Sequence, residues 1–360
     1  MRRTKFKKII LLAGLLVAAG AHADDRFNIN GFGFADYRQT NANTIDDADQ
    51  RGTWNNAIFA LVMSFKITDH DYAWAQLESK PTEPTEFTWA YLEHNFNDNL
   101  SARVGRIKLP YGLYNEFIDN KALQLSAVVP SAYSFRADMV HDAYSGIGID
   151  WTSGSLLTQV YGGNVYTPPN NGAITDSYVD RRLFGTRITW NTPYEGLRFM
   201  FSGWDSQSED DTGITAVPPL GQIGKEYRVM YSADYVSDRF DIKAEHNHHG
   251  TPTQTDSPGL SSNAWYVQGG YKLGQWTPYA RFDYFIGDQN IPSDPTSYQK
   301  DWVVGVNYKI NDYINARIED HVIYGYGLAV ANQDMVDSTG APVAGKTNWN
   351  LMAAEVNFMF

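Results

Sequence analysis

The chain has 360 residues, no cysteine and a formal net charge of −12. The acidic balance argues against a nucleic-acid partner, because nucleic acid is bound through basic surface, and the absence of cysteine excludes disulfides. Aromatic residues make up 14% of the chain and charged residues 19%. This composition suits a soluble β-sandwich or a membrane barrel, and the pattern along the chain must separate the two.

The first 23 residues have the layout of a secretory signal peptide. Five basic residues lie among positions 2–8, an apolar run covers 9–19, and Ala21-His22-Ala23 resembles a cleavage site. The apolar run is shorter than the roughly 20 residues that a spanning helix needs. We expect residues 1–23 to be removed. The remaining 337 residues, 24–360, carry 24 basic and 41 acidic residues, a net charge of −17.

After this segment no apolar run approaches the length of a spanning helix, but several segments alternate apolar and polar residues. The clearest are 27–37, 227–235, 240–247, 276–286 and 302–310. In the third of these, Phe240 and Ile242 alternate with Asp241 and Lys243. A helix, with its period of 3.6, would put neither set on one face, so the pattern predicts β-strands. Charges on the alternate face predict a wet interior rather than a buried one.

The connections between these segments alternate between short turns and long polar loops. Seven short turns, such as Asn97-Asp98-Asn99, are rich in Asn, Asp, Gly and Pro. The eight long connections are 39–54, 80–85, 108–141, 167–181, 207–223, 249–262, 287–298 and 327–346. This layout is typical of bacterial outer-membrane barrels.

Fifteen connections predict 16 antiparallel strands in an all-β transmembrane barrel. We expect them to begin near residues 27, 55, 71, 86, 100, 142, 155, 182, 196, 224, 239, 263, 276, 299, 313 and 347. The third, fourth and seventh alternate weakly, so 14 or 18 strands stay open as alternatives. A barrel of 16 to 18 strands leaves an aqueous channel.

The longest connection, 108–141, is also the least hydrophilic. It contains apolar residues such as Leu109, Tyr111, Leu113 and Phe117, which an external loop in water has little reason to carry. We predict that this third long loop folds into the lumen and packs on the wall. The alternatives are a membrane-facing cap or a clasp between subunits.

Residues 103–112, RVGRIKLPYG, resemble a signature of Gram-negative outer-membrane porins, G-R-x-K-x-P-[FY]-G. Together with the strand count and the long third loop, they make the chain similar to the 16-stranded general diffusion type. The following LYNE, 113–116, looks like a gammaproteobacterial porin-like branch. The resemblance implies a homotrimer in outer-membrane lipid and lipopolysaccharide, a constriction built by the third loop, and passive diffusion of small hydrophilic solutes and ions.

In that family, basic wall residues face acidic residues of the inserted loop, and the resulting field sorts solutes. The basic wall candidates are Arg38, Arg103, Arg106, Lys108, Arg187, Arg228, Arg281 and Arg317. The acidic loop candidates are Glu116, Asp119 and Asp138. We expect Arg103, Arg106 and Lys108 to oppose Glu116 and Asp119; the alternative is a set of ordinary solvated charges. Arg106 breaks the alternation with Arg103, so one points elsewhere or a bulge separates them.

No catalytic, metal or cofactor motif accompanies this pattern. His246, His248 and His249 do not fit a closed ligand set, and no nucleophile elbow, P-loop or Rossmann fingerprint occurs. The leading interpretation is a general diffusion channel with a weak preference for cations, from the acidic charge. A sugar- or anion-specific channel is the alternative, and a barrel enzyme or adhesin is a third.

The last segment, 349–360, places Met352, Ala354, Val356, Phe358 and Phe360 on one face. With 16 strands it must pair with 27–37 and remove the open edge of the sheet. The resemblance implies that its aromatic end, Phe358 and Phe360, is read by the outer-membrane assembly machinery.

Overall fold

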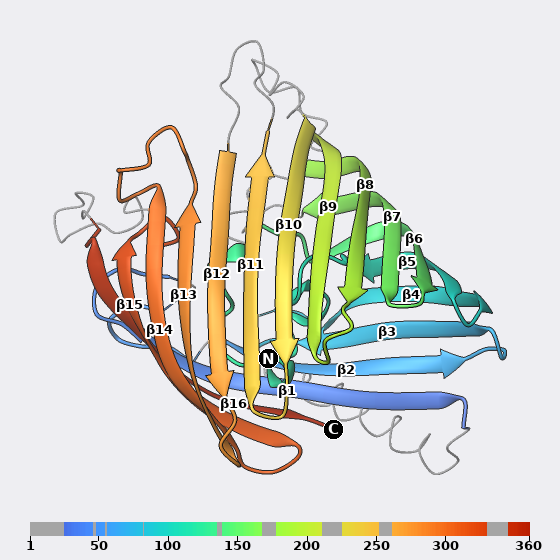
Figure 1. Ribbon diagram of the computed structural model, residues 1–360, viewed down its shortest axis with the longest axis horizontal. Coiled ribbons are helices and arrows are strands. Elements are labelled where there is room, and N and C mark those ends of the chain that lie inside the picture. The colour runs from blue at the N-terminus through green and yellow to red at the C-terminus, as the bar shows by residue number, and fades with distance from the viewer. Residues whose placement is uncertain are drawn as a thin grey trace, which may run out of the picture.

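The computed structural model describes residues 25–45, 48–54, 56–81, 83–134, 139–167, 178–210, 225–251, 261–329 and 345–360. The expected signal peptide, 1–23, lies outside these ranges. Within them the chain forms one closed barrel of antiparallel strands, in which each strand pairs with its neighbours in sequence and β1 pairs with β16 (Figure 1). No helix in these ranges is long and apolar enough to cross a bilayer.

The barrel contains the 16 strands that the sequence predicts. They are β1 (Phe27–Thr40), β2 (Ala57–Lys66), β3 (Asp71–Ser79), β4 (Glu86–Asn97), β5 (Leu100–Lys108), β6 (Ala143–Ser153), β7 (Leu156–Thr167), β8 (Tyr178–Asn191), β9 (Leu197–Asp210), β10 (Lys225–Val236), β11 (Phe240–Gly250), β12 (Ser261–Tyr271), β13 (Trp276–Ile286), β14 (Tyr298–Lys309), β15 (Ile314–Gly325) and β16 (Asn348–Met359). The prediction of a closed 16-stranded barrel is confirmed.

Bulges explain where the sequence pattern was weak. The β3–β4 pairing shifts between Gln76 and Leu77, and the β7–β8 pairing shifts between Gly163 and Val165. A bulge adds one residue, so the side chains beyond it change faces and the alternation breaks. The predicted start of β8 at 182 is wrong by four residues, because the pairing with β9 also shifts, between Arg181 and Phe184.

The two faces of the wall differ as the alternation predicts. On β14, Trp302 and Val304 are exposed on the outer face, whereas Asp301 on the inner face is buried. On β15, Ile318 and Val322 point outward, while Glu319, His321 and other polar residues of the inner face are buried. An apolar outside and a polar inside are what a barrel needs in lipid.

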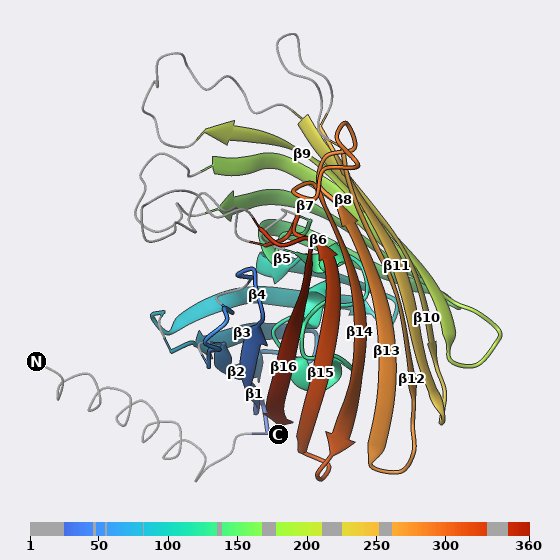
Figure 2. The same cartoon turned by 90° about the vertical axis from the view of Figure 1, so that its left-hand side faces the viewer.

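The barrel closes where β1 meets β16, as predicted. The pairing runs from Phe32 opposite Met359 to Thr40 opposite Leu351. Beyond it the Gly31 N–H donates to the Phe360 carbonyl oxygen at 2.9 Å, and the Phe360 N–H donates to the Gly31 carbonyl oxygen at 2.8 Å. Figure 2 shows β16 beside β1, with no open edge between them.

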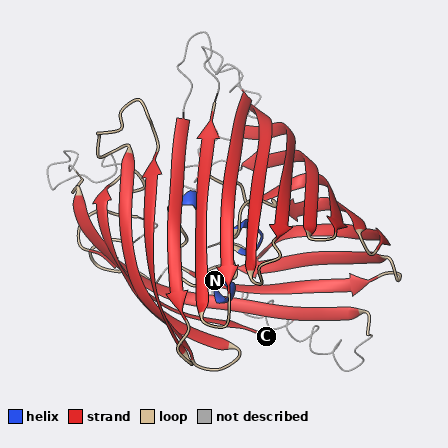
Figure 3. Cartoon of the chain, in the orientation of Figure 1, coloured by secondary structure: helices blue, strands red, loops and turns tan. Residues whose placement is uncertain are grey.

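One long connection carries the helical turns of the described chain. The third loop, residues 109–142, contains η2 (Asn115–Phe117), η3 (Lys121–Leu123) and η4 (Ser131–Tyr133), drawn as helices in Figure 3. η3 contacts β1 and β16, whereas η4 contacts β11, β12 and β13. The loop therefore touches strands that are separated around the barrel.

Candidate functional site

The third loop begins with the motif Leu109-Pro110-Tyr111-Gly112, which is fully buried. Gly112 has φ of +60°, a conformation that favours glycine. A Cβ there would overlap the Tyr133 hydroxyl and the Met230 sulfur. The Gly112 N–H donates to the Ser202 hydroxyl on β9 at 3.0 Å. The motif thus turns the chain against the wall at a point where no side chain fits.

Glu245 on β11 is the main acceptor for this loop. Its Oε1 accepts from the Leu113 backbone N–H at 2.8 Å, and its Oε2 accepts from the Tyr133 hydroxyl at 2.6 Å. Two wall hydroxyls complete the set, Ser232 at 2.5 Å and Tyr266 at 2.8 Å. The carboxylate is 3% exposed. A buried carboxylate with four donors fixes the start of the loop relative to β11.

Further wall groups bind the loop backbone. Asn247 donates to the carbonyl oxygens of Ala132 at 2.8 Å and Met139 at 2.9 Å. Glu319 on β15 accepts from the N–H groups of Ala127 at 3.1 Å and Val128 at 2.7 Å. Backbone groups that lack a strand partner are thus satisfied by side chains of the barrel.

Three of the predicted basic wall residues also hold the loop. Arg187 pairs with Glu116. Arg281 donates to the Val128 carbonyl oxygen at 2.8 Å, and Arg317 donates to those of Ser126 at 2.7 Å and Lys121 at 2.8 Å. These guanidinium groups are bound to fixed oxygens rather than standing free.

Lys108 meets Asp119, as the sequence predicts, and it also meets Asp142. Burial opposes ionisation of Asp119, but the Lys108 ammonium outweighs it and holds the pKa of that carboxyl below its usual range. Burial raises the pKa of Asp142, the second carboxyl that shares this ammonium. Gln76 on β3 donates to Asp119 at 3.4 Å. Asp119 therefore links the loop to two strands of the wall, β5 through Lys108 and β3 through Gln76.

Arg103 and Arg106 diverge. Arg103 pairs with Asp150 on β6 rather than with a loop acid. Arg106 shares the strand face of Val104, which is exposed, and its Nε donates to the Thr88 carbonyl oxygen at 2.7 Å. The β5–β6 pairing has no shift between the two arginines, so they point to different faces and no bulge separates them.

The remaining basic candidates pair within the wall. Arg38 binds Asp36 at 2.8 Å. Arg228 lies 3.3 Å from Glu226, and its guanidinium is 4.5 Å from the centre of the Trp204 ring. Asp138, the third acidic candidate, lies outside the described residues.

The ion pairs around the loop share an asymmetry in exposure. In the Glu116–Arg187 pair the acidic side chain is 29% exposed and the basic one 9%. In the Asp119–Lys108 pair the values are 21% and 8%. In both, the carboxylate is the more exposed member of the pair and the cation the more buried one.

Comparisons with solved structures show which fold the chain has. No protein-family model and no curated protein matches the sequence. Solved structures do match it over almost its whole length. An anion-selective porin from Comamonas acidovorans has a TM-score of 0.63 at 10% identity and covers 93% of this chain and 100% of its own. The chain has the fold of Gram-negative outer-membrane porins.

Two further solved structures are similar to the chain over almost its whole length. The outer membrane channel DcaP of Acinetobacter baumannii has a TM-score of 0.61 at 14% identity, covering 93% of this chain and 97% of its own. OmpT of Vibrio cholerae in a trimer form has a TM-score of 0.60 at 13% identity, covering 93% and 99%. The resemblance seen in the sequence is confirmed at the level of the porin fold.

The wall residues that hold the loop were not predicted as its partners. Glu245, Asn247 and Glu319 are polar residues of predicted strand faces, and nothing local distinguishes them from solvated lumen residues. Asn247 accepts from the Tyr111 hydroxyl at 2.6 Å across 136 residues of sequence. Such a partnership exists only once the barrel has closed.

Proposed function

We propose that this protein is an outer-membrane porin that forms a water-filled channel for passive diffusion of small hydrophilic solutes and ions. The closed ring of 16 strands carries the proposal, because barrels of 16 to 18 strands leave an aqueous channel. The apolar outer face suits lipid, and the polar inner face suits water. We propose a channel rather than an enzyme.

We also propose that residues 1–23 direct export and are removed as a signal peptide. The protein then assembles into a homotrimer in outer-membrane lipid and lipopolysaccharide. The trimer form of Vibrio cholerae OmpT supports the trimer. Recognition of Phe358 and Phe360 by the assembly machinery is also proposed. No part of this proposal needs a metal or a cofactor.

We further propose that the third loop crosses the channel and narrows it. Support comes from its contacts with β1, β11, β12, β13 and β16 and from the hydrogen bonds to Glu245, Asn247 and Glu319. A loop held by buried polar groups of the inner face leaves open only the spaces beside it, and Asp119 lines two of these cavities. The constriction then lies at Asp119.

The channel should prefer cations. At Glu116 and Asp119 the carboxylates are the exposed members of their ion pairs, so a passing ion meets negative charge first. A low-dielectric wall focuses such a field. An anion-selective channel fits less well, because Arg187 and Lys108 lie behind their acidic partners.

Planar-bilayer recording of the purified protein tests the proposal. We expect stepwise ion currents and, in a KCl gradient, a reversal potential of cationic sign. The double variant Glu116→Gln and Asp119→Asn should move that potential toward zero. Asp69→Asn, in an exposed turn at the other end of the strands, should leave it unchanged. Absence of current from folded protein would overturn the channel, and an anionic sign would overturn the cation preference alone.

Cation preference should increase between pH 7 and pH 9 because of Lys121. Burial lowers the pKa of this loop lysine to about 8, with Glu355 opposing and Arg38 adding to the shift. Asp36 and Arg317 are the other charges that face it. The folded pKa lies below the ordinary 10.5, so the charge is present at pH 7 and lost by pH 9.

Loss of one positive charge beside the channel should raise the potassium-to-chloride permeability ratio by a factor on the order of two. Reversal potentials at the two pH values measure it. Lys121→Met should have the higher ratio at pH 7 already and should remove the change with pH. An equal change with pH in the variant would assign the titration to another group. Stability should rise between pH 8 and 10.5, because only the unfolded lysine still holds its proton.

A further inference from the structure

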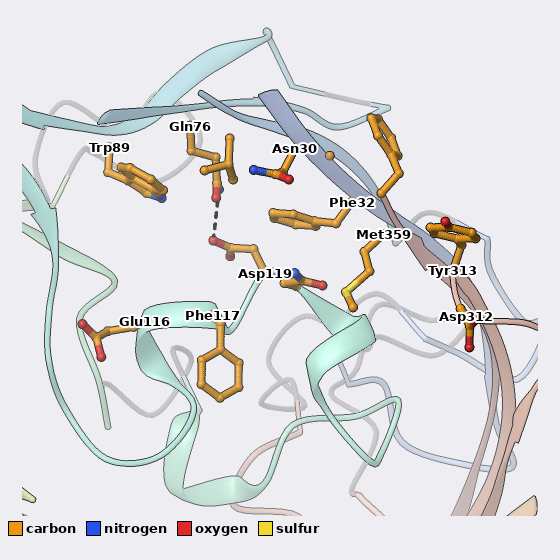
Figure 4. Close-up of a pocket in the computed structure, with 14 residues that line it drawn as sticks. Asn30, Phe32, Gln76, Trp89, Glu116, Phe117, Asp119, Asp312, Tyr313 and Met359 are labelled. Carbon is orange, nitrogen blue, oxygen red and sulfur yellow. Dashed lines mark hydrogen bonds between the residues drawn. The ribbon is translucent and has the colours of Figure 1, made fainter. Parts of the chain in front are cut away.

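A cavity of about 440 Å³ lies between the third loop and the β1–β4 side of the barrel (Figure 4). Its lining includes the rings of Phe32, Trp89 and Phe117 and the carboxylates of Glu116 and Asp119. None of the described residues that line it is lysine, arginine or histidine. The cavity therefore offers aromatic faces and negative charge without a positive side chain.

The aromatic rings come from three elements and surround the same space. In Figure 4, Phe32 of β1 and Trp89 of β4 lie on the wall side, and Phe117 of η2 lies on the loop side. Trp89 is held in place by stacking on Tyr91, with ring centres 5.6 Å apart. Aromatic faces attract cations through the ring quadrupole, and tryptophan does so most strongly.

Each carboxylate is the more exposed member of an ion pair, so one side of it is open to the cavity while the other is bound to its cation. Their cations, Arg187 and Lys108, are buried behind them and do not line the cavity. Amide groups of Asn30, Gln76 and Asn120 complete the polar part of the lining. An inorganic ion would use the carboxylates alone, whereas an organic cation would use the carboxylates and the rings together.

We infer that this cavity is a binding site for small organic cations that carry a protonated amine or a guanidinium group. The inference rests on the proposed channel and names a class of solute that the channel favours. The ammonium contacts Glu116 and Asp119, and the carbon chain of the solute lies against Trp89 and Phe117. Neutral polyols of the same length lack the charge that both kinds of group attract.

Single-channel recording of the full-length protein with 1,4-diaminobutane tests the site, with 1,4-butanediol as the neutral probe of equal length. We expect the diamine to interrupt the potassium current in discrete events, and the diol to cause none at the same concentration. Trp89→Leu should raise the dissociation constant of the diamine about fivefold, because it removes the ring without changing any charge. Trp302→Leu, on the exposed outer face, is the matched control and should leave the constant unchanged.

The outcomes separate this inference from the proposed function. Potassium current without diamine events, or equal interruption by the diol, overturns the site and leaves the channel intact. A dissociation constant that responds to Asp119→Asn but not to Trp89→Leu assigns the effect to charge alone and also overturns it. Absence of any current is failure of the channel itself. The potassium current of each variant also reports that its barrel has folded.

Discussion

Replacing Glu245 with alanine is expected to release the third loop and raise the single-channel conductance. The change removes the acceptor of three buried hydroxyls, those of Tyr133, Ser232 and Tyr266. It also removes one of the two acceptors of the Leu113 N–H, which keeps the Tyr133 hydroxyl oxygen at 2.7 Å. Each buried donor left without a partner costs about 1–3 kcal/mol, so docking of the loop should weaken by several kcal/mol. The barrel should persist, because its closure depends on the hydrogen bonds between strands.

The conductance of Glu245→Ala should be larger and more variable than that of the wild type. The released loop should also become sensitive to limited proteolysis. Asp234→Ala is the matched control. It removes a buried wall carboxylate whose partners, Arg198 and Lys243, are themselves on strands. Unchanged conductance and protease resistance in Glu245→Ala would show that the loop does not narrow the channel, and a change in both variants would show a general effect of lost wall charge.

The strand plan could be predicted because its signals are local. Each strand alternates apolar and polar residues over about ten positions, and each turn is marked by residues such as Asn97, Asp98 and Gly274 that favour tight turns. Where a bulge reverses the faces, as beside Gln76 and at Arg181, the same local signal fails. The start of β8 was mispredicted for this reason.

The site could be predicted only in part. Alternation shows on which face of the barrel wall a side chain lies, but it does not show which residue of the loop that side chain contacts. It assigns Arg187, Arg281 and Arg317 to the inner face, but their binding of loop oxygens depends on how the loop crosses between strands. Lys108 and Asp119 are 11 residues apart and their pairing was predicted. Leu113 and Glu245 are 132 residues apart, and their hydrogen bond was not.

This difference has a functional consequence. Arg187, Arg281 and Arg317, which were expected to line a charged channel, bind the loop. We therefore propose that the charge a solute meets comes from the carboxylates of Glu116 and Asp119. Substituting Arg187 should therefore affect the position of the loop as well as the field. Under this proposal the selectivity follows from which member of each ion pair is exposed, and the net charge of the chain indicates its sign only indirectly.

Replacing Gly33 with valine is expected to impair closure of the barrel. Gly33 lies on β1 where Phe358 of β16 crosses it, and the Phe358 and Phe360 rings stack with their centres 6.5 Å apart. A Cβ at Gly33 would lie 2.7 Å from the Ile58 carbonyl oxygen and 2.7 Å from the Phe358 ring. The ring can move but the carbonyl oxygen of β2 cannot, so the pairing of β1 with its neighbouring strands must open. Overpacking of this kind costs about 1–3 kcal/mol.

Gly269→Val separates this clash from the effect of valine as such. Gly269 lies within β12, and a Cβ there meets nothing within 4 Å. Because valine favours strands, this control should fold at least as well as the wild type. The measurement is the folded fraction after refolding in detergent, read from the change in gel mobility on heating. Adding Phe358→Ala to Gly33→Val should restore folding only partly, since the Ile58 contact stays. Equal folding of the two valine variants would show that β1 accepts a side chain at position 33. Any role of Phe358 in assembly would then come from recognition rather than from packing on Gly33.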